Sequence, residues 1–432
     1  MKDNPKILIF TVASWNSRIG SNTWATLVDR YPAENLANIC IRDEYPDSNV
    51  CSRYFVISES KVLKSVFRRH IRTGYEVDKT DIAKMNTNSA LQEHNARYKK
   101  MSVKRKTYML LARELVWKFG RWHTEDLDTF LDDFKPDIIL HSMEGYIHLN
   151  RIIEYAIART QAKAVGYIWD DNFTYLQSKE LGHQFYRFFQ RKSLKKLAHK
   201  TDAFFAITKK TKKEADAFFK INSVLLTKPL LCVPEYCQTL VDYPIRMLYT
   251  GKLIIGREDT IRQIAEAIKE VNNSSGPKVL LDIYTNTQLD ENTKVKINNA
   301  WCQIHPAVPQ KEVYVLQKQA DILLFVEAIE GPKAKIARLS FSTKITDYLS
   351  TGKCIFAVGH KDTAPMEYFA ESSSAITAYD AESIKTAVEH IAVHPEVIQE
   401  TAKHGAEAAV KLHNPETIRE RFWSVLQEVL QK

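Results

Sequence analysis

Strand-like and helical segments alternate along this chain, and that alternation restricts its fold more than any other feature of the sequence. Apolar segments typical of buried strands occupy residues 6–14, 136–142 and 162–171, a helical segment occupies 144–160, and a further strand and helix share 201–219. Strands that alternate with helices build parallel sheets through right-handed connections. We therefore predict an α/β protein with parallel sheets.

The length of the chain predicts more than one domain. At 432 residues it is too long for one ordinary core, while 44% hydrophobic and 26% charged residues are typical of a globular protein. Prolines accumulate over 228–244, which indicates a linker, so we predict domains at 1–238 and 239–412. Residues 74–106 are polar and rich in Lys and Asn, and we predict a flexible insertion there.

Membrane and secretion signals are weak in this sequence. No apolar segment approaches the roughly 20 residues that span a bilayer, and the first apolar segment is better explained as a buried strand than as a signal peptide. The six cysteines are scattered without a Cys-x-x-Cys pair or a zinc-like spacing. These features predict a cytoplasmic protein with reduced cysteines.

The segment 340–359 predicts a polar loop, a helix and a buried strand, in that order. Ser342 or Thr343 can cap the helix, and with Lys344 they suit a phosphate, because free N–H groups and the helix dipole favour negative charge there. Asp347 lies one turn further along and can accept hydrogen bonds from sugar hydroxyls. The same residues also suit an ordinary capped helix with a surface lysine and aspartate.

Polar residues follow several of the predicted strands in the first half of the chain. Ligands of open parallel sheets bind beyond the carboxyl ends of the strands. Asp170 and Asp171 directly follow one strand, so either could deprotonate or orient an acceptor hydroxyl, or could instead cap the next turn. The other polar candidates at these strand ends are His141, Glu144 and Thr208.

The net charge of +9 is unevenly distributed. Residues 1–240 hold 39 Lys and Arg against 27 Asp and Glu, whereas 241–432 hold 22 against 25. The excess concentrates in 97–122 and 185–200, where aromatic residues alternate with basic ones. Such helices can lie at an anionic membrane surface, or can bury their aromatic residues and leave their charges in water. We favour membrane contact for the pair of segments taken together.

An ordered series of motifs occupies residues 245–360. A strand ends in a Gly-Lys-Leu turn at 251–253, Arg257 follows the lysine by five positions, another strand occupies 279–285, and Asp347 lies five positions before a glycine. In the order and spacing of these motifs the chain resembles the GT-B glycosyltransferases and, among them, the retaining family 4-like enzymes.

That resemblance implies a fold of two Rossmann-like domains that face each other across a cleft, with a terminal helix at 413–432 that returns to the N-terminal domain. It also implies transfer of a sugar from a nucleotide-diphosphate sugar to a glycan or lipid-linked acceptor, with retention and without a bound metal or other cofactor.

The resemblance also implies which residues bind the donor. Lys252 and Arg257 would stabilise the diphosphate charge, Thr343 and its helix would hold the distal phosphate, and Asp347 would accept the ribose hydroxyls. The implied donor site comprises Gly20, Gly251, Lys252, Arg257, Ser342, Thr343, Lys344 and Asp347.

The chain departs from the family at its paired acidic residues. Counted from the preceding strand, the first family glutamate falls on Glu330, followed by Gly331, and Glu327 is a second contender. Asp347 follows Glu330 by seventeen positions, a longer interval than the family usually has. The predicted catalytic residues are therefore Asp170, Asp171 and Glu330.

These features predict a glycosyltransferase that assembles surface polysaccharide or lipopolysaccharide at the inner face of the cytoplasmic membrane. A GT-B protein that binds a nucleotide sugar without transferring it, or an epimerase of that fold, is the alternative. A nucleic-acid binder also suits a pI near 9.0, but the chain has no recognised binding motif and an acidic C-terminal half, so we expect no nucleic-acid partner.

Overall fold

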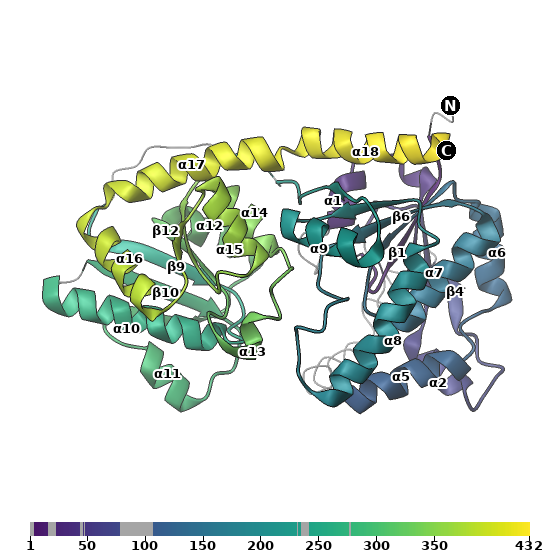
Figure 1. The fold of residues 1–432 in the computed structure, drawn as a ribbon, viewed down its shortest axis with the longest axis horizontal. Helices are drawn as coiled ribbons and strands as arrows, with labels where there is room; N and C mark the ends of the chain where they lie inside the picture. The colour runs from purple at the N-terminus through teal and green to yellow at the C-terminus, as the bar shows by residue number, and fades with distance from the viewer. Residues whose placement is uncertain are drawn as a thin grey trace. The chain divides into compact units, whose positions relative to one another are not determined.

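Figure 1 shows the fold of the protein in a computed structural model. Contacts divide the chain into two compact units. The first consists of Met1–Ile207, Lys212–Leu226 and Arg419–Lys432, and the second of Thr208–Thr211 and Thr227–Ile418. The main segment of the second unit thus begins at Thr227, earlier than the predicted domain boundary at residue 239. The structure describes residues 4–15, 23–43, 46, 48–77, 107–230, 232–234, 242–275 and 278–432.

The first unit is built on a sheet that has eight strands among the described residues, in the order β4-β3-β2-β1-β5-β6-β7-β8. All pairs are parallel except β3 with β4. The chain order reverses beside β1, between β2 and β5, which is the switch point where such sheets bind ligands. The strands are β1 (Ile7–Thr11), β2 (Leu36–Cys40), β3 (Arg53–Ile57), β4 (Gly74–Glu76), β5 (Ile138–Ser142), β6 (Lys163–Ile168), β7 (Ala203–Ala206) and β8 (Val224–Leu225).

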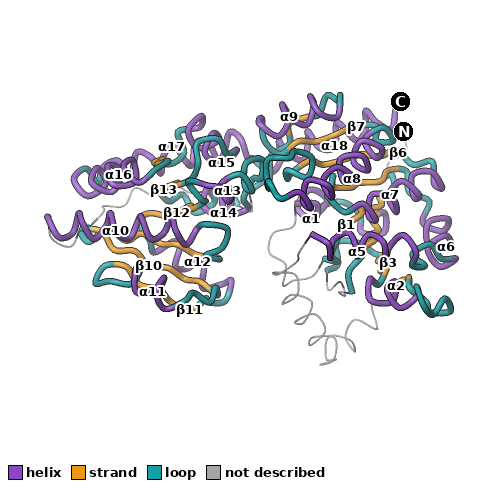
Figure 2. Tube along the Cα trace, turned by 60° about the horizontal axis from the view of Figure 1, so that its bottom comes forward, coloured by secondary structure: helices purple, strands orange, loops and turns teal. Residues whose placement is uncertain are grey.

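Helices cover this sheet, and Ile7, Leu8, Ile9 and Phe10 of its central strand β1 are fully buried, as expected for a parallel sheet packed on both faces. Figure 2 follows the strands between the helices. The helices of the first unit are α1 (Thr23–Val28), the 3-10 turn η1 (Ala33–Asn35), α2 (Glu59–Ser65), α5 (Thr107–Phe119), α6 (Glu125–Phe134), α7 (Ile147–Thr160), α8 (Leu181–Ala198), most of α9 (Lys209–Phe219) and most of α18 (Pro415–Gln431).

The second unit holds a smaller parallel sheet, with six strands among the described residues in the order β11-β10-β9-β12-β13-β14. Here the chain order reverses beside β9, between β10 and β12. The strands are β9 (Ile245–Thr250), β10 (Val279–Thr285), β11 (Cys302–Pro306), β12 (Ile322–Val326), β13 (Cys354–Val358) and β14 (Ile376–Ala378). Two parallel α/β sheets confirm the predicted fold class.

The helices of the second unit connect these strands and pack on them. A continuous core of buried side chains, including Met247, Ile264, Ile283, Leu324 and Phe356, joins the sheet to its helices. The helices are α10 (Arg257–Ser275), α11 (Glu291–Ile297), α12 (Gln310–Gln319), α13 (Gly331–Ala334), α14 (Thr343–Leu349), α15 (Ala364–Ser372), α16 (Ala381–Val393) and α17 (Glu396–His413).

The end of the chain packs on the first unit. Phe422 is fully buried and its ring lies 5.6 Å from that of Phe205, while Trp423 stacks on Tyr31 with ring centroids 4.5 Å apart. Arg419 pairs with Asp29 at 2.8 Å. These contacts bring residues 419–432, part of the predicted terminal helix at 413–432, onto the N-terminal sheet unit.

The predicted insertion at 74–106 needs a correction at its start. Residues 74–76 form β4, which pairs antiparallel with β3, because a tyrosine in this segment extends the sheet edge despite its polar surroundings. Residues 78–106 lie outside the described part of the chain. Among the described residues, no helix is long and apolar enough to span a membrane.

Candidate donor and acceptor sites

The turn between β9 and α10 borders the first candidate site, at the carboxyl end of the second sheet. Gly251 has φ +143° and Gly256 has φ +84°, values that favour glycine. A Cβ on Gly251 would lie only 2.8 Å from Cε of Lys344, so a side chain here would displace that lysine. Glycine at this position therefore lets the backbone and the Lys344 ammonium lie together.

Arg257 begins α10 and forms an ion pair inside this site. Its Nη2 and Nε donate to Glu327 at 2.8 and 3.1 Å, and its Nε also lies 3.1 Å from the carbonyl of Val326. Glu327 is buried at the end of β12. Burial opposes the charge of Arg257, but Glu327 outweighs that effect and the pKa of the guanidinium is raised. The carboxylate thus fixes the direction of a charged guanidinium.

Lys344 places a second cation beside Arg257. Its ammonium lies 4.3 Å from the ring centroid of Tyr249, a cation–π contact. Burial, and next the charge of Arg257, lower the pKa of Lys344 to about 8. Among the described residues, no carboxylate lies within ion-pair distance of this ammonium. The site therefore holds a cation whose charge favours an incoming anion.

Asp347, one turn further along α14, faces a third cation. Lys228 donates to its Oδ1 at 3.3 Å from a side chain that is only 2% exposed. Burial raises the pKa of Asp347, an effect that Lys228 and Lys344 oppose, and burial lowers the pKa of Lys228. Together the three cations and the carboxylates of Glu327 and Asp347 leave the cluster with an excess positive charge.

A second candidate site lies at the carboxyl ends of β5 and β6 in the first unit. Glu144 is half-buried and accepts a hydrogen bond from Ser142 Oγ at 3.1 Å. Loss of solvent, and next the charge of Asp170, raise the pKa of Glu144 to about 7. Arg42, which follows β2, opposes that shift. Two neighbouring acids of which one holds its proton near neutral pH could transfer a proton to or from a ligand.

Polar atoms without partners lie beside the same strand ends. Ser14 and Trp15 follow β1 and are buried, and within the described part of the chain Ser14 Oγ, Trp15 Nε1 and Arg42 Nε have no hydrogen-bond partner. Buried donors of this kind are costly unless a ligand or water accepts their hydrogens. They place polar atoms at the switch point of this sheet, where a ligand could accept hydrogen bonds from them.

Comparisons with known proteins identify the architecture around these two sites. No family model and no curated protein matches the sequence. Anabaena HepE in complex with UDP and glucose aligns over 98% of this chain and 100% of its own, with 9% identity and a TM-score of 0.61. An α,α-trehalose 6-phosphate synthase from Burkholderia multivorans aligns over 99% and 97%, with 10% identity and a TM-score of 0.55. The chain has the GT-B fold.

A third structure with the GT-B fold matches part of the chain. The pneumococcal O-GlcNAc transferase GtfA, in complex with UDP and GlcNAc, aligns over 73% of this chain and 61% of its own, with 12% identity and a TM-score of 0.50. At these identities the likeness is one of fold. It agrees with the resemblance inferred from the motif order at 245–360.

Several of the predicted donor-site residues of this GT-B chain come together in the structure. Gly251, Arg257, Lys344 and Asp347 lie together in the charged cluster described above. Ser342 caps α14 by accepting a hydrogen bond from the Lys344 N–H at 3.4 Å, while Thr343 is exposed. Because α14 has only seven residues, side-chain cations contribute more charge here than its dipole does.

Other predicted residues lie outside these clusters or outside the described residues. Lys252 is exposed, and its carbonyl accepts a hydrogen bond from Tyr249 Oη at 2.8 Å. Glu330 is exposed at the start of α13, whereas Glu327, the second contender, is buried against Arg257. Gly20 is not among the described residues.

Asp170 and Asp171 differ in their surroundings. Asp171 is fully buried and accepts hydrogen bonds from the backbone N–H of Thr174, at 2.9 Å, and from its hydroxyl. It therefore closes a turn, the alternative that the sequence left open, whereas Asp170 lies in the field of Glu144. His141 and Thr208 are buried and bonded to Thr201 and Thr211, at 3.1 and 2.7 Å.

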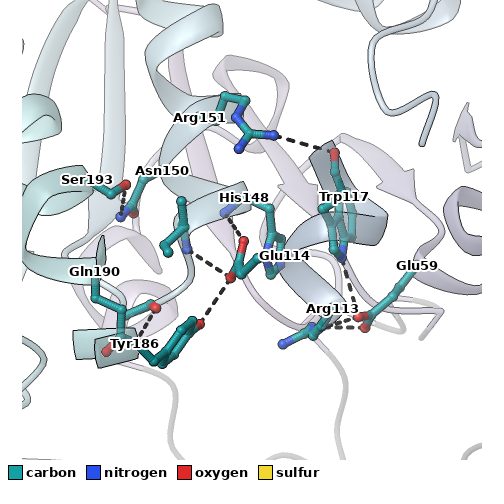
Figure 3. Close-up of polar contacts among 12 residues, drawn as sticks. Glu59, Arg113, Glu114, Trp117, His148, Asn150, Arg151, Tyr186, Gln190 and Ser193 are labelled. Carbon is teal, nitrogen blue, oxygen red and sulfur yellow. Dashed lines mark hydrogen bonds and ion pairs between the residues drawn. The ribbon is translucent and has the colours of Figure 1, made fainter. Parts of the chain in front are cut away.

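A Glu–His pair in the first unit resembles part of a catalytic triad but has a structural role (Figure 3). Glu114 accepts hydrogen bonds from the backbone N–H groups of Ile147 and His148, at 3.2 and 3.0 Å, and from His148 Nδ1 at 3.0 Å. Tyr186 donates to the same carboxylate at 3.1 Å. Glu114 thus caps α7 from α5, because it supplies acceptors for free N–H groups of the first turn.

Lys228 is the site residue that sequence reasoning missed. It lies 119 positions before Asp347, so no local spacing connects the two. The available signal was a lone lysine in the apolar segment around 224–233, where a buried cation requires a buried partner. Among the described residues, no group of three or more His, Cys, Asp or Glu side chains is arranged to hold a metal ion.

Proposed function

We propose that this GT-B chain is a glycosyltransferase that transfers a sugar from a nucleotide-diphosphate donor to a glycan or lipid-linked acceptor. The observation that carries the proposal is the juxtaposition of Arg257 and Lys344 beside Gly251, with Glu327 the only carboxylate paired to either among the described residues. Two cations at the carboxyl end of a parallel sheet suit a diphosphate.

The chemistry follows from where charge develops. When the bond between the anomeric carbon and the diphosphate breaks, the leaving group gains negative charge. Fixed cations stabilise that charge more in the transition state than in the ground state, and so accelerate the reaction. Arg257, held by Glu327, and Lys344 would supply the cations, while Asp347 would accept hydrogen bonds from the ribose. Lys252, which is exposed and directly follows Gly251, would supply a further cation to the diphosphate.

The acceptor hydroxyl would bind in the first unit, at the switch point of its sheet. Glu144 and Asp170 lie there, and one of them would orient the hydroxyl or take up its proton. Retention of configuration is proposed from the motif resemblance alone. The anomeric configuration of the product glycoside, read by NMR and compared with that of the donor, tests it directly.

Binding of donor is tested by thermal unfolding with UDP, GDP, ADP and CMP sugars. A ligand at about a hundred times its dissociation constant stabilises a protein by about 2.7 kcal/mol. We expect one nucleotide to raise the Tm, and Lys344→Met to abolish that rise. Lys403→Met, on the exposed face of α17, is the matched control. HepE and GtfA structures hold UDP, so the UDP sugars are tested first.

A second hypothesis is distinguished from the first by comparing donor binding with sugar transfer. If a donor binds and no sugar reaches any acceptor, the chain is a nucleotide-sugar-binding protein or an epimerase of the GT-B fold. Interconversion of the donor sugar, seen by NMR without an acceptor, would identify the epimerase. The departure of Glu330 from the family pattern motivates this alternative.

The acceptor is proposed to be lipid-linked, in the assembly of surface polysaccharide or lipopolysaccharide at the inner face of the cytoplasmic membrane. The supporting observation is a group of large apolar side chains on α5 and α8, helices that pack together. Phe185, Phe188 and Phe189 are 56%, 51% and 40% exposed. The alternative in which the helix buries its aromatic residues therefore does not hold for these three. We name this group the α5–α8 surface; it comprises Tyr108, Leu115, Phe119, Leu181, Phe185, Phe188 and Phe189.

Cations continue the exposed face of α8. Lys192 and Lys195 are exposed and follow Phe185 and Phe188 at helical spacing. Apolar side chains beside lysines suit an anionic bilayer, where the rings enter the interface and the ammonium groups meet the headgroups. The described part of the predicted segments 97–122 and 185–200 contributes to this surface.

A further inference from the structure

Lys228 is a buried cation anchored through its own backbone. Its carbonyl accepts a hydrogen bond from Nδ1 of His413, at 2.8 Å, and the next residue, Pro229, restricts Lys228 to an extended conformation. His413 is fully buried and its pKa is lowered to about 4, so the ring is neutral, with its proton on Nδ1. Its Nε2 then accepts a hydrogen bond from Tyr368 Oη at 2.9 Å.

Two more bonds fix the same segment to the end of α17. Thr227 Oγ1 donates to the carbonyl of Leu412 at 2.8 Å, and the N–H of Leu230 donates to the carbonyl of His413 at 3.0 Å. Hydrogen bonds on both sides of Lys228 leave its backbone little freedom. Its side chain therefore extends from a fixed backbone position into the charged cluster that contains Lys344 and Asp347.

The ammonium of Lys228 contacts α14 at two oxygens. It lies 3.3 Å from Asp347 Oδ1 and 3.4 Å from the carbonyl of Thr343. Within the described part of the chain, Oδ2 of Asp347 accepts no hydrogen bond, and the Asp347 side chain is 32% exposed. One oxygen of the carboxylate is thus held by the lysine, and the other is left for a ligand.

We infer that Lys228 is a positioning residue for nucleotide recognition: it holds Asp347 ionised and oriented, so that the free oxygen accepts hydrogen bonds from the vicinal hydroxyls of a ribose. The inference rests on the proposed function, because it takes Asp347 as the ribose contact. A buried carboxylate without a cation would take up a proton and lose half its acceptor capacity. Lys228 itself touches no ligand in this scheme, since its side chain is almost fully buried behind Asp347.

The test compares each of three nucleotides with its 2′,3′-dideoxy counterpart. The dissociation constants of UDP, GDP and ADP and of their dideoxy forms are measured by calorimetry for the wild-type protein, Lys228→Met, Asp347→Asn and the double variant. Hydrogen bonds to a charged group are worth a factor of ten or more, so we expect the wild type to prefer the ribonucleotide by about tenfold or more. The variant Lys228→Met should lose most of that preference while it keeps its affinity for the dideoxy form.

The double variant distinguishes positioning from direct contact. If Lys228 acts through Asp347, the substitution Lys228→Met has no further effect on the preference once Asp347 is Asn. The double variant also removes both charges together, so it remains informative if Lys228→Met alone fails to fold. Lys403→Met, on the exposed face of α17, is the control and should keep the preference of the wild type.

Each other outcome overturns the inference in an identifiable way. An equal loss of affinity for ribo and dideoxy forms in Lys228→Met would show that the lysine binds the phosphates or supports the fold in general. An unchanged preference would show that Asp347 needs no cation. A wild-type protein that binds none of the three nucleotides would overturn the proposed function, and this inference with it.

Discussion

The guanidinium of Arg257 donates to both carboxylate oxygens of Glu327, at 2.8 and 3.1 Å, across 70 positions of sequence. This pair joins the start of α10 to the end of β12. Glu327 is 4% exposed, and Arg257 forms an ion pair with it at 2.8 Å. The pair therefore orients the guanidinium that we propose binds a phosphate, and it places a cation beside a buried acid.

Substitution of Arg257 by Met should destabilise the second unit. Glu327 would remain as a buried carboxylate without its cation, and breaking such pairs costs about 3 kcal/mol or more. Urea unfolding at neutral pH measures the loss. The double variant Arg257→Met, Glu327→Gln should recover most of it; a double variant as unstable as the single one would show that the ion pair is not the cause.

The affinity for nucleotide should fall as the pH rises past about 8. The pKa of Lys344 lies near that value instead of the ordinary 10.5, so the ammonium that favours an anion is present below pH 8 and is lost above it. A bound phosphate shifts the loss to higher pH. Calorimetric titration between pH 6 and pH 10 follows this dependence.

The conservative variant Lys344→Arg provides the comparison for that experiment, because a guanidinium stays charged throughout the range. Its affinity, whatever its absolute value, should change little between pH 7 and pH 9. A wild-type affinity that is equally flat over those two units would contradict a role for the Lys344 charge.

Removal of the Glu144 charge should stabilise the first unit at alkaline pH. The pKa of this carboxyl is about 7 in the folded protein against an ordinary 4.5, so between these values the unfolded chain has lost a proton that the folded chain retains. Stability therefore falls as the pH rises through this window. Because Glu144 is only half-buried, we expect Glu144→Gln to add about 1–2 kcal/mol at pH 8.

Urea unfolding at pH 8 and pH 4.5 checks this expectation, since the gain should vanish at the lower pH. If Glu144 takes part in transfer, the same variant should lose activity while it gains stability, a trade expected of functional sites. Equal stability of the two proteins at pH 8 would mean that Glu144 is fully ionised at no cost.

Replacement of two phenylalanines on the α5–α8 surface by serine should weaken membrane binding. The double variant Phe185→Ser, Phe188→Ser removes two large exposed rings without opening a core. Its fraction bound to vesicles that contain anionic lipid, measured by sedimentation, should fall at least fivefold. Val393→Ser, which removes an exposed apolar side chain of α16, should bind as the wild type does, and a wild type that ignores such vesicles would exclude this surface as a membrane contact.

The sequence predicted the fold better than it predicted the site. The alternation of strands and helices and the order of motifs over 245–360 were sufficient for the GT-B fold, because both are local patterns with known spacing. They also named Gly251, Arg257, Lys344 and Asp347, which the structure brings together. What binds there remains a prediction.

The residues that sequence could not connect are those whose role depends on a distant partner. Lys228 contacts Asp347 only because the fold brings together two residues that are distant in the sequence. In the same way, only the structure shows that Glu327, and not Glu330, is buried against Arg257. Asp170 and Asp171 are adjacent and chemically identical, yet it is Asp171 that accepts the hydrogen bond from the Thr174 hydroxyl. Aromatic spacing on α8 likewise left open which rings face water.

The first unit includes residues 419–432, and Phe422 fills a place among its buried rings. On the ribosome, the strands β1 to β8 leave the exit tunnel long before that phenylalanine is translated. The nascent first unit therefore stays incomplete until the second unit has been synthesised. The residues of the second unit are therefore translated before the segment that completes the first, and deletion of residues 419–432 would expose Trp24 and Phe205 of the first unit.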